Sequence, residues 1–187
     1  YFYNPTEDYL INLYAAENGE AGFRFTGGTR ILATNLRADS NEMAFDFYGF
    51  TKGHFTNCIG RDSKSNVVYR LRGCEDLTFV NCEAEGPATG DWQYGFLISS
   101  SPVQACKRIA LIGCRAYNFA GAGGGTGVRI DSGQEDTVIV GGHYYGNSLA
   151  QISDEGTGTI IKANAGFVTE NSGTATFSGD GSTTTFT

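Results

Sequence analysis

The chain carries a sequence repeat of about 22 to 24 residues, and this repeat limits the folds open to it. Three copies read EDLTFVNCEAEG, KRIALIGCRAYN and EDTVIVGGHYYGN, at residues 75–86, 107–118 and 135–147. Each copy begins with a charged pair, continues with an apolar run, and reaches a Cys or Gly after a small or amide residue. Copies in register indicate a stack of like units, each packing on its neighbours.

The residue that ends each apolar run defines a column along the chain. The steps between its members are 22, 24, 32, 28 and 22 residues, so the middle copies contain insertions. Asn tolerates left-handed backbone conformations, and stacked side-chain amides can bond to one another, so we expect a ladder of turns here. The members are Asn35, Asn57, Asn81, Gly113, Gly141 and Ala163.

A second column lies upstream, in segments such as GFRFTGG, AFDFYGF and VYRLRGC. Apolar residues alternate with polar ones in these segments, which predicts strands with one buried face. The spacing of leucine-rich repeats is absent, and a β-sandwich would not give columns of constant period. The inward positions are Phe23/Phe25, Phe45/Phe47, Tyr69/Leu71, Phe96/Ile98, Val128/Ile130 and Ile152.

These patterns predict an all-β fold, a parallel β-helix (β-solenoid) of about six to seven coils. We assign residues 1–168 to it and expect that it begins mid-helix, before residue 1. Residues 169–187, rich in Thr, Ser and Gly, abandon the period and form a cap, a linker or the start of a further β domain.

The coil period, the apolar stacks and the TNC, VNC and IGC turns resemble the right-handed parallel β-helix family. That pectate-lyase-like family includes pectate lyases, polygalacturonases and the spikes and fibres of tailed phages. The resemblance covers roughly residues 9–167 and implies the family's Asn and Cys ladders. The NTD, DD and GHG motifs of polygalacturonases are absent from the sequence, as is an Asp-rich calcium cluster, so the resemblance concerns the fold and not a reaction.

Composition excludes several classes of partner. The net charge of −7 argues against nucleic acid, and no apolar run approaches the ~18 residues of a membrane span. The five cysteines are an odd number without metal-ligand spacing, and we expect no cofactor and no metal. We expect small buried thiols in two columns: Cys58, Cys82 and Cys114, and Cys74 and Cys106.

Outward positions of the upstream strands carry the candidate binding residues. One outward column is Arg24, Asp46, Arg70, Leu97, Arg129 and Gln151, and the next is Thr26, Tyr48, Arg72, Ser99, Asp131 and Ser153. They form either a solvated face with cross-strand ion pairs or a polar groove for an extended polymer, including an acidic one.

Three enlarged loops, at residues 83–94, 99–105 and 116–127, favour the groove, because they would form the walls of a cleft. Trp92 in the first loop is a candidate platform for a sugar ring, and an anchor inside the loop is the other interpretation. The predicted substrate-binding residues are Arg70, Arg72, Trp92, Tyr94, Ser99 and Arg129.

Two carboxylates are candidates for catalysis. Asp131 is expected to face outward beside Arg129, and Asp154 lies one coil further on, displaced by one residue. Glycoside hydrolysis needs two carboxylates flanking the bond, whereas a lyase needs a base and a cation that neutralises the sugar carboxylate. The sequence leaves open whether the chain is an enzyme. If it is one, we expect a polysaccharide lyase or a glycoside hydrolase.

Two functions follow as expectations. The first is an extracellular or virion-surface module that binds polysaccharide or a cell-surface glycan, as in a tail spike or a secreted carbohydrate-active protein, with cleavage left open. The second is a structural fibre or surface-filament module that assembles end to end. Either module could act as a homotrimer or a polymer.

Overall fold

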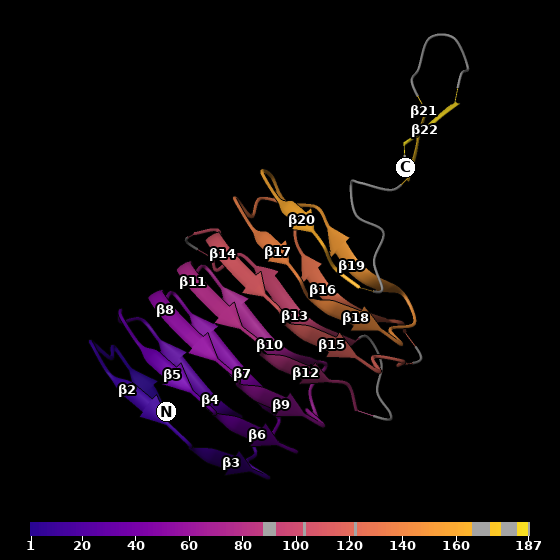
Figure 1. Cartoon of the computed structure of the whole chain (residues 1–187). Helices are drawn as coiled ribbons and strands as arrows, with labels where there is room; N and C mark the ends of the chain where they lie inside the picture. Colours follow the sequence, from indigo (N-terminus) through magenta and orange to yellow (C-terminus); the bar gives the residue numbers. More distant parts are fainter. Residues whose placement is uncertain (88–92, 103, 122, 166–172, 177–182, 187) are drawn as a thin grey trace.

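The computed structural model describes residues 1–87, 93–102, 104–121, 123–165, 173–176 and 183–186. Its regular elements in these ranges are strands, β1 to β22, and no helix occurs among them. Three parallel sheets, here called A, B and C, are wound by successive strands of the chain, so that every third strand returns to the same sheet (Figure 1). The described residues contain no helix long and apolar enough to cross a membrane.

Sheets A and B each have seven strands. Sheet A contains β1 (Phe2–Tyr3), β4 (Ala21–Thr26), β7 (Met43–Tyr48), β10 (Val67–Arg72), β13 (Gln93–Ser99), β16 (Gly125–Ile130) and β19 (Ala150–Asp154). Sheet B contains β2 (Tyr9–Ile11), β5 (Leu32–Thr34), β8 (Thr51–Thr56), β11 (Glu75–Val80), β14 (Lys107–Ile112), β17 (Val138–Val140) and β20 (Ile160–Lys162).

Sheet C has six short strands. They are β3 (Tyr14–Ala16), β6 (Arg37–Asp39), β9 (Ile59–Arg61), β12 (Glu83–Glu85), β15 (Arg115–Tyr117) and β18 (His143–Tyr145). Two further strands, β21 (Gly173–Thr176) and β22 (Thr183–Phe186), pair with each other in antiparallel fashion. The predicted boundary between residues 168 and 169 falls outside the described residues.

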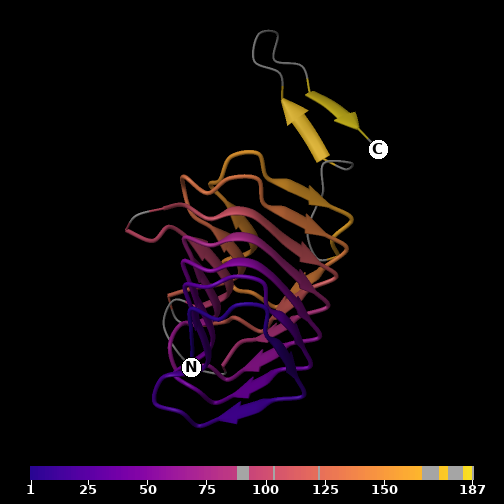
Figure 2. The same ribbon diagram turned by 90° about the vertical axis from the view of Figure 1, so that its left-hand side faces the viewer.

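The three sheets form a β-solenoid of about six turns, which confirms the predicted fold class (Figure 2). Equivalent residues of successive coils are hydrogen-bonded neighbours, as where Phe45 pairs with Tyr69 and Tyr69 with Phe96. Strands of parallel sheets lie about 4.8 Å apart, so side chains of one column stack directly on each other.

The core is built from these stacked columns. The rings of Phe45 and Tyr69 lie 4.5 Å apart, and so do those of Tyr69 and Phe96, in nearly parallel planes. Tyr69 is fully buried, and its hydroxyl donates a hydrogen bond of 2.7 Å to the carbonyl oxygen of Cys58. The ring gains apolar contacts on both faces while its polar tip stays satisfied.

The predicted turn column is confirmed by its backbone. All six members have positive φ angles, from 51° at Asn81 to 66° at Gly141. The side-chain nitrogen of Asn35 donates to Oδ1 of Asn12 at 3.0 Å, so the ladder extends one coil earlier than predicted. A Cβ at Gly113 would lie 2.5 Å from Oδ1 of Asn81, which explains why glycine follows asparagine there.

The predicted cysteine columns are also present. All five thiols are free and buried. The backbone N–H of Cys74 donates to Sγ of Cys106 in the next coil at 3.2 Å. The thiols therefore fill the corners of the coil as small buried side chains that also form weak hydrogen bonds with the backbone.

The predicted register is wrong in the last coil of sheet A. Arg129 pairs with Ser153 and not with Gln151, because Ile152 fills the position of Val128. Strand β19 has a single inward aliphatic residue where the earlier strands have two, so its pattern left the register ambiguous by two positions.

Candidate functional site

The outer face of sheet A carries most of the predicted binding residues. On the described strands, outward positions alternate with buried ones such as Phe45 and Phe47. The pairing Arg24–Asp46–Arg70–Leu97–Arg129 is confirmed, and it places five side chains in one column across five coils.

Asp46 lies among three arginines on this face, Arg24, Arg70 and Arg72, and we call these four residues the Asp46 cluster. Its carboxylate accepts hydrogen bonds from Nε of Arg24 at 3.1 Å, and from Nε and Nη2 of Arg70 at 3.0 Å each. Nη2 of Arg72 lies 3.4 Å from Oδ1 of the same carboxylate. The side chain of Asp46 is only 2 % exposed, whereas each arginine is about a quarter to a third exposed.

This arrangement leaves an excess of positive charge. Three guanidinium groups share one carboxylate, so two positive charges are not balanced within the Asp46 cluster. Glu20 offsets one of them from the rim, through an exposed ion pair with Arg24. The fork of Arg70 is fixed by its bidentate bond, whereas Nε of Arg72 is buried without a hydrogen-bond partner.

A hollow of about 300 Å³ adjoins the Asp46 cluster. Two aromatic rings border it: the guanidinium of Arg72 lies 5.0 Å from the centre of the Tyr48 ring, and that of Arg24 lies 5.6 Å from the ring of Tyr1. Stacking on a ring holds an arginine in place through cation–π attraction while its N–H groups stay available. The hollow thus combines cations with flat apolar surface.

Arg129 forms the centre of a second cluster two strands away, which we call the Arg129 cluster. Its Nε donates to Asp131 at 2.9 Å, its Nη2 to Glu155 at 2.7 Å and its Nη1 to Ser153 at 2.7 Å. The hydrogen bond to Asp131, together with that to Glu155, raises the pKa of the guanidinium above its ordinary value. Here one cation serves two carboxylates, so the excess charge is negative.

The predicted site is therefore divided. Arg70 and Arg72 meet in the Asp46 cluster, and Arg129 lies apart, beyond Leu97 and Ser99 of β13. Ser99 Oγ donates to the carbonyl oxygen of Leu71 at 3.3 Å, which ties it to the neighbouring strand.

Tyr94 lies on β13 between Val67 and Thr126, at the start of the strand. Trp92 lies outside the described residues, as do parts of the three predicted wall loops.

The two predicted catalytic carboxylates have different partners. Asp131 accepts the hydrogen bond from Arg129, whereas Oδ1 of Asp154 accepts from the backbone N–H of Gly156 at 2.8 Å and from Thr159 at 3.1 Å. Asp154 pairs in register with Ile130, so the carboxylate that shares Arg129 with Asp131 is Glu155. Their catalytic role stays a prediction.

A third ion-pair cluster, on sheet C, was not predicted from the sequence; we call it the Glu83 cluster. Glu83 is buried, and its carboxylate accepts from Arg61 at 2.8 Å, from Arg115 at 2.5 Å and from the hydroxyl of Tyr117 at 2.8 Å. Burial alone would raise the pKa of Glu83, but the hydrogen bonds from Arg61 and Tyr117 and the charge of Arg115 lower it overall. With Glu85 beside Arg61, this cluster is balanced in charge.

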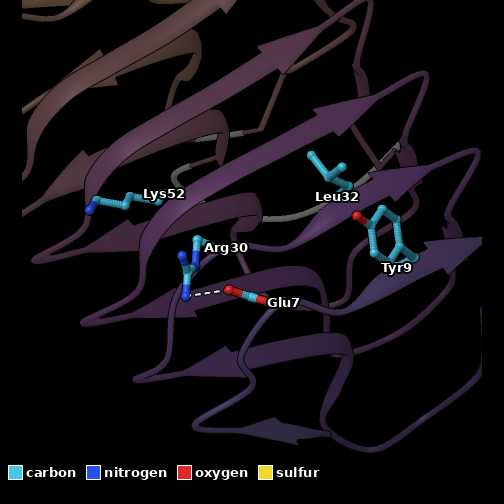
Figure 3. Close-up of a pocket in the computed structure, with 5 residues that line it drawn as sticks. All are labelled: Glu7, Tyr9, Arg30, Leu32 and Lys52. Carbon is cyan, nitrogen blue, oxygen red and sulfur yellow. Dashed lines mark ion pairs between the residues drawn. The ribbon is translucent and has the colours of Figure 1, made fainter.

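A second hollow, of about 350 Å³, lies on the first coils of sheet B (Figure 3). Tyr9 and Leu32 stand side by side on neighbouring strands, and Arg30 forms an ion pair with Glu7. Lys52 lies beyond Arg30. Glu7 neutralises Arg30, so Lys52 is the positive charge that remains in the lining of this hollow.

Within the described ranges, no three His, Cys, Asp or Glu side chains gather in a group that could hold a metal ion. Comparison of the chain with protein-family models, with curated proteins and with solved structures gave no match.

Proposed function

We propose that the chain is an extracellular or virion-surface β-helix module, of the pectate-lyase-like kind, that binds polysaccharide on the outer face of sheet A. One observation carries the proposal: three arginines converge on one nearly buried carboxylate and leave positive charge beside a hollow with aromatic borders. The glycan that fits such a site carries carboxylate or sulfate groups.

The physical argument rests on preorganisation. Asp46 holds Arg24, Arg70 and Arg72 in fixed positions, so little side-chain entropy is lost when an anion binds their remaining N–H groups. Arginine is suited to planar carboxylates and to sulfate because its N–H groups form a rigid fork. Tyr1 and Tyr48 offer flat surfaces for the apolar faces of sugar rings.

The site is also matched to an extended ligand. Outward residues recur about every 4.8 Å along the solenoid axis, and the face continues from the Asp46 cluster to Leu97 and Ser99. A polymer lying along the axis would contact several coils at once. Because the whole chain carries a net charge of −7, this local excess of cations would also direct an acidic polymer to this face.

Titration of carboxylated, sulfated and neutral polysaccharides against the chain, by calorimetry at low salt, tests the proposal. We expect binding of an anionic polymer. In the double variant Arg70→Gln, Arg72→Gln we expect Kd to increase by about tenfold or more, because charge-assisted hydrogen bonds are removed. The matched control is Arg30→Gln, Arg37→Gln, which removes two ion-paired arginines outside sheet A. Equal loss in both double variants, or preference for neutral polymers, would contradict the proposal.

Cleavage is a separate question that the same polymers can answer. Assays for new reducing ends and for unsaturated products would be run with the unaltered chain, Asp131→Asn and Asp154→Asn. Product lost in one variant, while calorimetry shows unchanged binding, would support catalysis by that carboxylate. Bound polymer without product would support a binding module.

A structural fibre module is the second candidate. It is favoured by the outer face of sheet B, whose middle strands present no Lys, Arg, Asp or Glu side chain between their two edges. A stiff solenoid with such a face is suited to packing against another protein surface.

A further inference from the structure

The middle of sheet B has an outer face of uncharged side chains. On β8, β11, β14 and β17, the inward residues such as Phe79 and Leu111 are fully buried, so the alternate residues face outward. Ile112 is 42 % exposed. The outward residues are His54, Thr56, Thr78, Val80, Ala110, Ile112, Val138 and Val140, and none of them is Lys, Arg, Asp or Glu.

One edge of this face carries a row of charges with alternating sign. The row consists of Lys52, Asp76, Arg108 and Asp136, one from each of four successive coils. All four have positive φ angles, between 53° and 57°, so they hold the same backbone conformation at the same place in the coil. We call these residues the charged row.

The two inner members of the charged row are already paired. Nε of Arg108 donates to Oδ1 of Asp76 at 2.6 Å, and this hydrogen bond lowers the pKa of Asp76. The outer members differ, since among the described residues neither Lys52 nor Asp136 takes part in an ion pair. Both outer side chains are exposed.

On these four coils the order plus, minus, plus, minus is complementary to its own reverse. On the flanking coils the same column holds Arg30 and Gly158, which the twofold operation sets opposite each other. A twofold axis parallel to the strands, placed between β11 and β14, sets the coils of a second copy against this face in reversed order. Lys52 then faces Asp136 of the partner subunit, and Asp76 faces Arg108 of the partner subunit. Since the axis is twofold, each of these contacts occurs twice.

The same operation matches the apolar positions. Val80 comes opposite Ile112 of the partner subunit, and Leu32, which is exposed near one end, comes opposite Ile160 of the partner subunit at the other. A twofold axis along the solenoid would instead place the charged row against the Asn turn column, whose residues are uncharged. Charge and apolar pattern thus select the antiparallel arrangement.

We propose that the outer face of sheet B is the interface of an antiparallel homodimer of this chain. It has an apolar centre and a charged edge, which is the usual anatomy of a protein interface. The proposal is independent of the glycan site, because that site lies on sheet A.

The size of the face sets the expected strength. Six strands at about 4.8 Å and five residues of about 3.3 Å give a face of roughly 24 to 29 Å by 16 Å, or about 400–460 Å² per subunit before surface roughness. Stable interfaces bury about 800 Å² per partner, so we expect a weak dimer with a Kd in the micromolar range.

Sedimentation equilibrium of the full chain and of charge-reversal variants, over about 1 to 200 µM at low salt, tests the proposal. We expect a monomer–dimer equilibrium that Asp136→Lys weakens by about tenfold or more, because Lys52 of the partner subunit then faces a like charge. Lys52→Glu alone should weaken it similarly, and the double variant Lys52→Glu, Asp136→Lys should restore dimerisation.

The matched control is Asp62→Lys, which makes the same charge change at an exposed residue with a similar positive φ, outside sheet B. Ile112→Ser tests the apolar centre without risk to the buried core, and we expect it to weaken the dimer while Asp62→Lys does not. A monomer at every concentration, a trimer or polymer unaffected by these changes, or a failure of the double variant to restore dimerisation would overturn the proposal.

Discussion

The Asp46 cluster and the Arg129 cluster lie on the same face of the same sheet and use the same chemistry with opposite proportions. In the first, three guanidinium groups share one carboxylate that is 2 % exposed. In the second, one guanidinium group serves two carboxylates that are 40 % and 53 % exposed. Ion pairing on stacked strands therefore does not fix the sign of the local charge.

The difference favours the Asp46 cluster as the proposed ligand site. Where cations exceed anions around a fixed carboxylate, an incoming anion supplies the missing charge and the protein is already arranged for it. Where two exposed carboxylates share one arginine, each nitrogen of that arginine already donates a hydrogen bond. Three predictions follow from the largest expected effect to the smallest, two within these clusters and one in the balanced cluster around Glu83 on sheet C.

The largest effect is expected from Asp46→Asn, which keeps the size of the side chain and removes its charge. Three guanidinium groups would then face one another with only the exposed Glu20 as a counter-charge, and we expect a loss of about 3 kcal/mol in the free energy of unfolding. Urea denaturation measures this loss. Asp131→Asn is the matched control, and because its carboxylate is exposed we expect it to cost less than about 1 kcal/mol. Equal losses would mean that burial does not distinguish the clusters.

The fold was largely predictable, because its signals are local and repeated. Alternation along each strand and the turn residue after each apolar run do not depend on distant contacts, so columns such as Asn35 to Ala163 could be aligned directly. The register failed only in β19, where one inward residue, Ile152, replaces two. The short strands of sheet C have too few residues to show a period, and the Glu83 cluster was therefore missed.

The site was predictable only as a column of neighbours. The sequence places Asp46 between Arg24 and Arg70, but the nearly complete burial of its carboxylate depends on how long arginine side chains fold over it. The ion pair between Arg129 and Glu155 could not be predicted from the column either, because it depends on the register of β19 at the end of the sheet.

An intermediate effect is expected from Glu83→Gln in the balanced cluster. We expect a loss of about 1–2 kcal/mol at pH 7, because hydrogen bonds from Arg61, Arg115 and Tyr117 lose their charged acceptor. The pKa of Glu83 is lowered by folding, so its stabilising contribution is complete above the ordinary glutamate pKa of about 4.3 and disappears as the pH falls through the folded value.

Denaturant titrations at several pH values measure this effect. The difference in stability between the unaltered chain and Glu83→Gln should shrink as the pH falls below about 4.3, and its sign should not reverse. Glu20→Gln is the control, since Glu20 is an exposed partner of Arg24. A difference that grows on acidification would show that burial, and not ion pairing, dominates the titration of Glu83.

The smallest effect is expected from Arg129→Gln. Removing the shared cation leaves Asp131 and Glu155 facing each other, but water screens both carboxylates because both are exposed. We therefore expect a loss of less than about 1 kcal/mol at low ionic strength, which becomes smaller in about 1 M salt as the repulsion is screened. Urea denaturation at the two salt concentrations measures it, and Arg70→Gln gives the comparison within the Asp46 cluster. A loss as large as that of Arg70→Gln, and insensitive to salt, would contradict the distinction between the two clusters. Arg129 would then contribute as much to the stability of the fold as an arginine beside Asp46.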